Sequence, residues 1–268
     1  MFDLHVHTTA SDGEFSPLEI LEKAKSLNID TISITDHDTT DGIEEAIEYS
    51  KKININFIPG IELDAHVSKG KMHILGYYFD INDTNLLSSM QSFKKDREDR
   101  NNKFIQEFNK QGINVTIEDI NKYSIGSILA KPHFARALLD KGYINNIEDA
   151  YSNYFNVSPM KDIKRKSISP KEAITLIKKA GGIAILAHPI TLKLNYDELR
   201  IEIKKLKEVG LDGIECYNSI HSSDDIKELI KIAEEYDMLI TGGSDYHGPI
   251  STPDYEMAKG KNNNIANM

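Results

Sequence analysis

The sequence contains a single cysteine, Cys216, and no tryptophan. Because Cys216 has no second cysteine to pair with, an intrachain disulfide and a zinc site built from several thiolates are both excluded. Any bound metal ion would have to be held by imidazole and carboxylate groups. A glycine-rich phosphate-binding turn is also lacking, since neither G-x-G-x-x-G nor a Walker motif follows any predicted strand.

Long apolar segments and an excess of positive charge are lacking as well. The longest apolar runs, such as residues 182–187, are far shorter than the roughly 18 to 20 residues of a membrane span, and the N-terminus has no basic-then-apolar signal pattern. We therefore expect a soluble, cytoplasmic protein that binds no membrane. The formal net charge of −10 argues against a broad basic surface for long duplex nucleic acid, but leaves a local cationic pocket possible.

The 268 residues are enough for one large α/β domain or for one domain that carries an insertion. Alternating and fully apolar runs predict seven strands, at residues 2–6, 31–35, 56–62, 72–79, 183–187, 212–217 and 239–243. Capping signals at Ser16, Asp41 and Ser169 predict helices that follow some of these strands. This alternation favours a closed parallel barrel over an open doubly wound sheet.

Residues 81–167 interrupt the regular pattern with a polar, helical segment that contains no strong strand. We interpret this segment as a helical insertion. The barrel domain is then discontinuous and comprises residues 1–80 and 168–250. Residues 251–268 form a polar C-terminal tail, which we expect to be frayed from Gly260 onward.

Residue types that bind metals recur at or just past the ends of the predicted strands. His5 and His7 stand two apart on one strand, so their side chains share a face and can chelate one ion. Each position also has a structural alternative: Asp12 precedes Gly13 as a turn residue would, and His73 could be a hydrogen-bonded core histidine. The nine residues are His5, His7, Asp12, His37, Glu62, His73, His188, Asp245 and His247. Their joint placement at strand C-termini favours a metal centre on one rim of the barrel.

Two of these positions have additional support from their neighbours. Glu62 ends a predicted strand next to Ile61, where an unpaired carboxylate would be costly to bury unless cations share it. His37 is flanked by Asp36 and Asp38, so a carboxylate hydrogen bond to its free ring nitrogen is plausible.

The motifs around these residues resemble the PHP family, named for polymerase and histidinol phosphatase domains. They are Asp3-Leu-His5-Val-His7-Thr with Ser11-Asp12-Gly13, Thr35-Asp36-His37-Asp38, Gly60-Ile-Glu62, His73-Ile-Leu-Gly76, Ala187-His188-Pro189 and Ser244-Asp245-Tyr-His247-Gly248. The resemblance runs from residue 2 to about residue 248 and is closest to the standalone phosphoesterase branch. It implies an α/β fold, a distorted (β/α)7 TIM-like barrel with a helical insertion, and two to three divalent metal ions.

The resemblance also implies how the ligands are shared. His5, His7, Glu62 and Asp245 would hold one ion, and Glu62 would bridge to a second ion held by His73 and His188. Asp12, His37 and His247 would hold the third. Nitrogen and oxygen ligands suit Mn²⁺, Fe²⁺ or Zn²⁺, and the sequence does not choose among them.

Substrate-binding residues are expected in the insertion. Arg97 and Arg100 lie three apart and would share a helix face; a solvated surface is the alternative, but similar phosphoesterases place arginines here against a substrate phosphate. Lys131 stands where the family usually has arginine, so it keeps the charge but loses the bidentate fork. His133 would contact substrate or cap its own helix, and His221 corresponds to a family position near the pocket.

The implied reaction is hydrolysis of a phosphomonoester of a small nucleotide, such as a nucleoside 3′,5′-bisphosphate or AMP, or release of 5′-terminal nucleotides from short RNA. A metal-activated hydroxide would attack in line, with Asp12, His37 and Glu62 acting at the metal ions. His221 or a metal-bound water would protonate the leaving oxygen. We expect a small phosphorylated substrate, no long duplex nucleic acid, and a monomer or weak homo-oligomer.

Three other hypotheses stay open. Histidinol phosphate is another substrate within the family, although the shorter chain and the segment 131–136 favour the nucleotide branch. A metal-dependent amidohydrolase barrel also begins with His-x-His and ends with a strand-terminal Asp, but it leaves Asp12, the His37 motif and His247 unexplained. A non-catalytic barrel that keeps metal ions for stability would stay at background turnover after reconstitution with Mn²⁺ or Fe²⁺.

Overall fold

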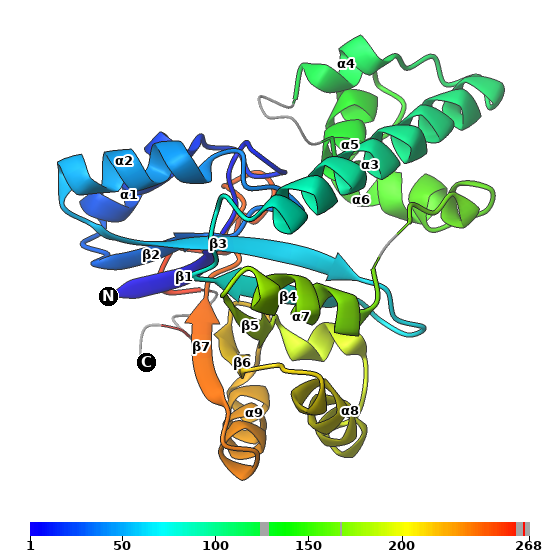
Figure 1. The fold of residues 1–268 in the computed structure, drawn as a ribbon. Helices are drawn as coiled ribbons and strands as arrows, with labels where there is room; N and C mark the ends of the chain where they lie inside the picture. The colour runs from blue at the N-terminus through cyan, green and yellow to red at the C-terminus, as the bar shows by residue number, and fades with distance from the viewer. Residues whose placement is uncertain (124–128, 167, 261–264, 266–268) are drawn as a thin grey trace.

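The computed structural model describes residues 1–123, 129–166, 168–260 and 265 (Figure 1). Within them, one seven-stranded sheet runs in sequence order. The strands are β1 (Phe2–Val6), β2 (Thr31–Ile34), β3 (Asn56–Ala65), β4 (Met72–Tyr77), β5 (Ile183–Leu186), β6 (Gly213–Asn218) and β7 (Leu239–Gly243). An isolated parallel bridge between Val6 and Tyr246 joins β1 to the segment after β7, so the sheet curls toward closure. The prediction of a seven-stranded α/β barrel is confirmed.

The expectation that all strands are parallel is wrong at β4. β4 runs antiparallel to both β3 and β5, whereas the other neighbouring pairs are parallel. β3 ends at Ala65 and β4 begins at Met72, and this connection is too short for a parallel crossover, which needs about a dozen residues or more. The reversal places the first residues of β4, rather than its last, at the rim where the parallel strands end.

β3 is longer than the predicted strand 56–62, and it changes partners along its length. Residues 56–59 pair with β2, whereas residues 60–65 pair with β4. A Cβ atom on Gly60 would lie 2.2 Å from the Ser33 hydroxyl, so this crossing of the strands requires glycine. Glu62 therefore lies inside β3 and not at its end.

Helices cover the outside of the barrel. They are α1 (Pro17–Ser26), α2 (Ile43–Ile53), α7 (Pro170–Lys179), α8 (Tyr196–Glu208) and α9 (Ser223–Glu235), with a short 3-10 turn η3 (Pro189–Leu192) after β5. The capping boxes at Ser16 and Ser169 are confirmed, since each hydroxyl accepts from the backbone N–H of a glutamate three residues on. The cap expected at Asp41 is wrong by one residue, because Gly42 occupies the N-cap of α2.

Residues 84–162 form the helical insertion, drawn in green at the upper right of Figure 1. It contains α3 (Thr84–Lys110), α4 (Ile117–Asn121), α5 (Lys131–Asp140), α6 (Ile147–Ala150), η1 (Tyr151–Phe155) and η2 (Met160–Asp162). Phe104, Phe108, Phe134 and Phe155 pack together with ring centroids 5.3 to 6.3 Å apart, so the insertion has a hydrophobic cluster of its own. The exact division of the chain into domains stays a prediction.

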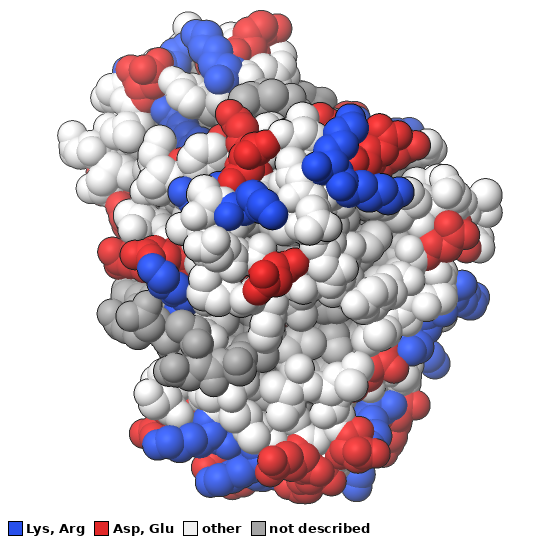
Figure 2. Space-filling model, turned by 90° about the vertical axis from the view of Figure 1, so that its left-hand side faces the viewer, with Lys and Arg blue, Asp and Glu red and all other residues white. Residues whose placement is uncertain are grey.

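Surface composition agrees with a mixed-charge protein. On the face shown in Figure 2, lysine and arginine side chains are interspersed with aspartate and glutamate, and uncharged side chains cover much of the middle. None of the helices within the described ranges combines the length and the apolar character that crossing a membrane requires.

The segment after the last strand is more ordered than the expected polar tail. Met257 and Ala258 are buried in the core cluster that contains Ile20 and Ile32. The backbone N–H of Ala258 donates to Asp3 Oδ2 at 2.7 Å, which ties this segment to β1. Residues 261–264 and 266–268 of the predicted frayed end lie outside the described residues.

Candidate metal centre

Glu62 lies at the centre of a group of histidines. Its carboxylate oxygens are close to His5 Nε2 (3.4 Å), His7 Nε2 (3.4 Å), His37 Nδ1 (2.9 Å), His73 Nδ1 (2.9 Å) and His188 Nε2 (3.0 Å). His5 lies in β1 and His7 directly after it, His37 follows β2, His73 lies at the start of β4, and His188 lies between β5 and η3. Glu62 is completely buried, and a carboxylate in such a place needs positive charge around it.

Two further carboxylates extend this group. Asp245 Oδ1 lies 3.4 Å from His5 Nε2 and 3.3 Å from His7 Nε2. Asp12 Oδ1 lies 3.4 Å from His247 Nε2, and the rings of His7 and His247 stack with centroids 4.0 Å apart. The structure thus brings all nine sequence-predicted ligand residues together at one rim of the barrel.

The potential ligand atoms form four overlapping groups, within each of which all atoms lie within 4.8 Å of one another. The groups are His7, Asp12, His37 and His247; His5, His7 and Asp245; His5, Glu62 and His188; and His37, Glu62 and His73. His5, His7 and His37 each belong to two groups, whereas the family resemblance assigns each of them to one ion. The assignment of each side chain to a particular ion therefore stays a prediction.

The donor atoms fit metal ions. Nε2 of His5 and Nε2 of His7 are buried and make no hydrogen bond within the described part of the chain. Buried polar atoms normally have a partner, and a divalent cation coordinated by these nitrogens would supply it. Imidazole and carboxylate groups are suitable ligands for Mn²⁺, Fe²⁺ and Zn²⁺.

The electrostatics keep the central carboxylate ionised. Burial by itself raises the pKa of Glu62, but the charges of His73, His37 and His5 outweigh it and lower the pKa well below its usual range. Burial has the same effect on Asp12, and there His37 and His247 lower the pKa. Both side chains are therefore in the anionic form that binds cations.

Three residues at this rim have an unusual backbone conformation. Asp38, His188 and Asp245 adopt positive φ angles of 55°, 25° and 55°. Such angles are uncommon for residues other than glycine, and they concentrate where the surrounding structure holds a functional group in place. His188, whose φ of 25° and ψ of 64° lie outside the usual left-handed region, is the clearest of the three.

Glu215 in β6 contacts His5 on the ring nitrogen opposite to the one that lies near Glu62. The sequence interpretation did not identify Glu215. Its Oε1 lies 2.8 Å from His5 Nδ1, and its Oε2 accepts from the backbone N–H of His188 at 2.7 Å and from Asn218 Nδ2 at 3.0 Å. A carboxylate on the far ring nitrogen fixes the orientation and tautomer of a ligand histidine. A charged residue in the middle of the predicted strand 212–217 was the signal that could have identified it.

We expect Glu215→Gln to weaken metal binding by about 10- to 100-fold, because the substitution removes the charged partner of His5 without changing its shape. Competition titration against a chelator measures this affinity. Glu208→Gln, at an exposed position of α8, is the matched control and should leave the affinity unchanged. Equal affinities for the Glu215 variant and the wild type would contradict this role.

The carboxylates that flank His37 have other partners than expected. Asp36 accepts hydrogen bonds from the backbone N–H of Thr8 at 2.8 Å, from the Thr8 hydroxyl at 2.6 Å and from the Ser11 hydroxyl at 2.5 Å. Asp36 therefore positions the loop that carries Asp12. The hypothesis that these carboxylates orient the His37 ring is replaced by this arrangement.

Asp38 holds the insertion to the barrel. Its Oδ2 accepts from Arg97 Nη2 at 2.6 Å and from Arg165 Nη1 at 2.7 Å, and Arg165 Nη2 donates to Asp64 Oδ2 at 2.6 Å. Burial raises the pKa of Asp38, but Arg165 and Arg97 outweigh it and lower the pKa to about 2. Arg97, which was expected to bind substrate, thus already forms an ion pair with Asp38. Arg165, in the run Lys164-Arg165-Lys166, forms a second ion pair with Asp38, and the sequence interpretation did not identify it.

Arg100 and Lys131 line a cavity of about 440 Å³ together with Arg97 and the metal-ligand candidates Asp12, His37, Glu62, His73, His188, Asp245 and His247. Burial and the charges of Arg97 and Arg165 lower the pKa of Arg100 to about 9. The Lys131 ammonium lies 5.2 Å from the centroid of the Phe155 ring. Positive side chains of the insertion therefore face the predicted metal centre across one cavity.

His133 and His221 are not among the described residues that line this cavity. His133 Nδ1 accepts from the backbone N–H of Ala130 at 3.0 Å, so this side chain caps α5, which is the structural alternative. His221 is buried, and its Nδ1 lies 2.8 Å from the carbonyl oxygen of Cys216. Its neighbour Ile220 lines the cavity instead.

Comparisons with known proteins find a matching family model, similar proteins and similar solved structures over most of this chain. The family model described as the PHP domain matches residues 3–209. A 5′-3′ exoribonuclease from Haemophilus influenzae is 32% identical over 92% of this chain and 90% of its own length. A 3′,5′-nucleoside bisphosphate phosphatase from Chromobacterium violaceum is 26% identical over 92% of this chain and 87% of its own. A solved structure from Bifidobacterium adolescentis, described as a candidate metal-dependent phosphoesterase, has a TM-score of 0.85 at 28% identity and covers 99% of this chain and 94% of its own.

Proposed function

Because this chain belongs to the PHP family of metal-dependent phosphoesterases, we propose that it hydrolyses a phosphate ester of a small nucleotide. The substrate would be a nucleoside 3′,5′-bisphosphate, an AMP-like nucleotide, or the 5′ end of a short RNA. The observation that carries this proposal is the cavity in which Arg100 and Lys131 face the histidines around Glu62. A phosphate bound there would meet cationic groups on one side and the predicted metal ligands on the other.

Two to three divalent ions, Mn²⁺, Fe²⁺ or Zn²⁺, would be held by the nine side chains His5, His7, Asp12, His37, Glu62, His73, His188, Asp245 and His247. When bound, such ions activate water for attack and neutralise charge on the phosphoryl oxygens. Fe²⁺, Mn²⁺ and Zn²⁺ all accept this donor set, so the identity of the metal has to be measured by elemental analysis of the purified protein.

The chain's own residues would bind and orient the phosphate. Arg100 presents a guanidinium to the cavity, and Lys131 presents an ammonium without the bidentate fork of arginine. Arg97 lines the same cavity but shares its charge with Asp38, so we assign it to positioning α3 as well as to the field around the phosphate.

A cytoplasmic location and a monomeric or weakly associating chain remain predictions.

A product-resolved screen tests the proposed function. Protein reconstituted with each metal is assayed against adenosine 3′,5′-bisphosphate, AMP, histidinol phosphate, 5′-phosphorylated RNAs of a few nucleotides and a panel of amides. We expect phosphate release from the nucleotides or mononucleotide release from the RNA. Highest activity on histidinol phosphate or on an amide would contradict the proposal, and background turnover with every metal would favour a non-catalytic barrel.

We expect Lys131→Ala to raise KM by about 10- to 100-fold, because a charge-assisted contact to phosphate contributes about 1.5–3 kcal/mol, while kcat stays within about twofold. Steady-state kinetics on the best substrate of the screen measures both constants. Lys103→Ala, at an exposed position of α3, is the control. A fall in kcat at unchanged KM would place Lys131 in the chemical step instead.

A further inference from the structure

Glu14 joins the two loops that carry the predicted ligands Asp12 and His247. Its backbone N–H donates to the carbonyl oxygen of His247 at 2.8 Å. Its Oε1 accepts from the backbone N–H groups of Ile250 at 3.1 Å and Ser251 at 2.6 Å. The Glu14 side chain is only 9% exposed, and carboxylate hydrogen bonds that are shielded from water are stronger than exposed ones. Glu14 therefore fixes the chain that follows His247 against the loop that contains Asp12.

The turn after His247 is fitted closely to the Glu14 side chain. Gly248 adopts a φ of +116°, and a Cβ atom on it would lie 2.5 Å from the Glu14 carboxyl carbon. Both the positive φ and the close approach require glycine. Within the turn, the backbone N–H of His247 donates to the Thr252 hydroxyl at 3.1 Å. The backbone of His247 thus has little freedom to move independently of Glu14.

Arg136 connects the helical insertion to the same carboxylate. Its Nη2 donates to Glu14 Oε1 at 2.7 Å and to the Ser251 hydroxyl at 2.7 Å. Arg136 lies in α5, and Lys131 at the start of the same helix lines the cavity of the predicted metal centre. The position of α5 beside this cavity is therefore linked to the turn that carries His247.

His247 and Asp12 belong to one group of potential ligands, which also contains His7 and His37. Asp12 Oδ1 lies 3.4 Å from His247 Nε2, although the two side chains come from different loops. One ion held by both needs a fixed separation between these loops, because metal–ligand distances vary by only about 0.2 Å. Glu14 belongs to one loop and is hydrogen-bonded to the other, so it sets that separation.

We propose that Glu14 and Arg136 are positioning residues that couple the docking of α5 to metal binding at the group that contains Asp12 and His247. This inference rests on the proposed function, because it concerns the metal centre on which that function depends. Such coupling is reciprocal. The contact between Arg136 and Glu14 raises the affinity of this group for an ion, and a bound ion holds α5 more firmly against the barrel.

Glu14→Gln tests the effect on the metal, because it keeps the shape of the side chain and removes its charge. Metal-free protein is titrated with Co²⁺, whose absorption spectrum reports the ligand geometry of each bound ion. We expect one ion per chain to bind at least about 10-fold more weakly, since lost support of a metal ligand costs about 10- to 100-fold in affinity. The other ions should bind as in the wild type. Glu48→Gln, at an exposed position of α2, is the control.

Arg136→Gln tests the effect on the insertion from the other side of the contact. Hydrogen exchange of the α5 amides is measured in Co²⁺-loaded and in chelator-treated protein. Bound metal should slow this exchange in the wild type, and the difference should vanish in R136Q and in E14Q. A purely structural role would accelerate exchange equally in both states, and that outcome would overturn the coupling.

The two substitutions should not add. Both remove the same contact, so the double variant E14Q/R136Q should bind the ion no more weakly than E14Q does. Losses of affinity that sum would show independent action and would overturn the proposal. A thermal melt verifies that each variant folds. If E14Q does not fold, R136Q carries the test, because the Arg136 side chain is more exposed, at 15%.

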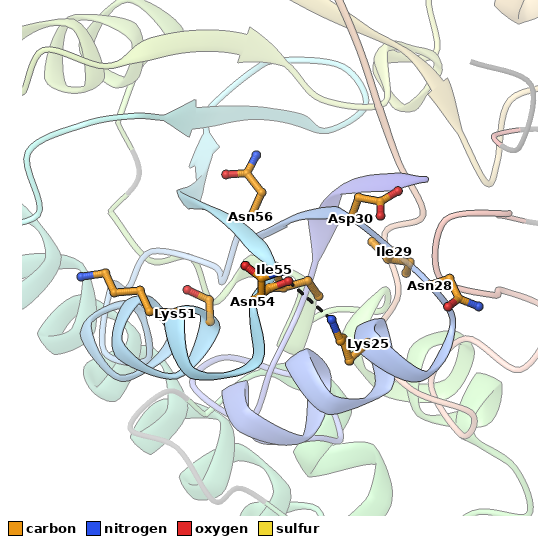
Figure 3. A pocket seen from close by; sticks show the side chains of 9 residues that line it. Lys25, Asn28, Ile29, Asp30, Lys51, Asn54, Ile55 and Asn56 are labelled. Carbon is orange, nitrogen blue, oxygen red and sulfur yellow. Dashed lines mark hydrogen bonds between the residues drawn. The ribbon is translucent and has the colours of Figure 1, made fainter.

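A control for Arg136 lies at the opposite end of the strands. Figure 3 shows a hollow near the ends of α1 and α2 and the first residue of β3, and Lys51 is one of its lining residues. Lys51→Gln removes one positive charge, as Arg136→Gln does, but far from the metal centre. We expect it to change neither the Co²⁺ affinity nor the exchange of α5.

Metal binding separates failure of this inference from failure of the proposed function. Metal-loaded wild type that hydrolyses no phosphate ester refutes the proposed function, and the titration and exchange measurements still decide the coupling. Wild-type Co²⁺ affinities in both E14Q and R136Q overturn the coupling, and the proposed function then stands or falls with the substrate screen alone.

Discussion

Glu62→Gln is expected to reduce turnover to background and to remove metal from the protein. Glutamine keeps the shape of the side chain but replaces a carboxylate that lies within 3.4 Å of nitrogens from five histidines. The amide carries no negative charge, and its NH₂ group cannot coordinate a cation. Ligand groups that share Glu62 would therefore lose their common anion at once.

Elemental analysis after dialysis measures the metal content, and the product assay measures turnover. Two groups of potential ligands contain Glu62, so we expect the loss of more than one ion per chain if the bridging assignment holds. Glu215→Gln is the informative comparison, because it changes a neighbouring buried carboxylate that touches His5 but is not a predicted ligand. Retention of full metal content and turnover in Glu62→Gln would refute the central position of this carboxylate.

Asp38→Asn is expected to destabilise the protein by about 3–5 kcal/mol, because it leaves the buried guanidinium of Arg97 without its carboxylate and leaves Arg165 with Asp64 alone. Arg97 and Arg165 both donate to Asp38 Oδ2, and the side chains of both arginines are only 8% exposed. Arg97 lies in α3, the first helix of the insertion, and Arg165 follows η2 at its other end, so the same substitution weakens the contacts of Asp38 with both parts of the chain.

Urea unfolding measures this effect in metal-loaded and in chelator-treated protein, so that a change in metal binding is not mistaken for a change in the ion pairs. Asp99→Asn, at an exposed position of α3, is the control and should change the free energy of unfolding by less than about 0.5 kcal/mol. A loss below about 1 kcal/mol for Asp38→Asn would show that the guanidinium groups find other partners.

Local sequence patterns were sufficient to predict most strands of the barrel and some of its helix starts. Alternation of apolar residues located the strands, and the serine caps at Ser16 and Ser169 located two helix starts, since both signals depend on residues within one turn or one strand. The direction of β4 was not recognised, although the short connection between Ala65 and Met72 contained the information. The expectation that β4 is parallel extended the strand–helix repeat across a connection that forms an antiparallel hairpin between β3 and β4.

Most of the predicted metal ligands lie at a strand end or in the segment next to it, where the sequence pattern pointed, whereas Glu62 lies inside β3, beyond the crossing at Gly60. Glu215 and Arg165 were not predicted from the sequence, because each acts through a partner that is far away in sequence. Glu215 contacts His5 across 210 positions, and Arg165 contacts Asp38 across 127. No spacing rule connects such pairs.

The sequence by itself determined the kind of chemistry available, because the types and local spacing of the nine ligand residues specify nitrogen and oxygen donors and exclude thiolates. Only the tertiary structure decided how those donors are shared. It placed Glu62 among five histidines, engaged Arg97 with Asp38, and joined Arg136 of the insertion to Glu14 of the barrel. Charge neutralisation depends on distances in space, and those distances exist only once the chain has folded.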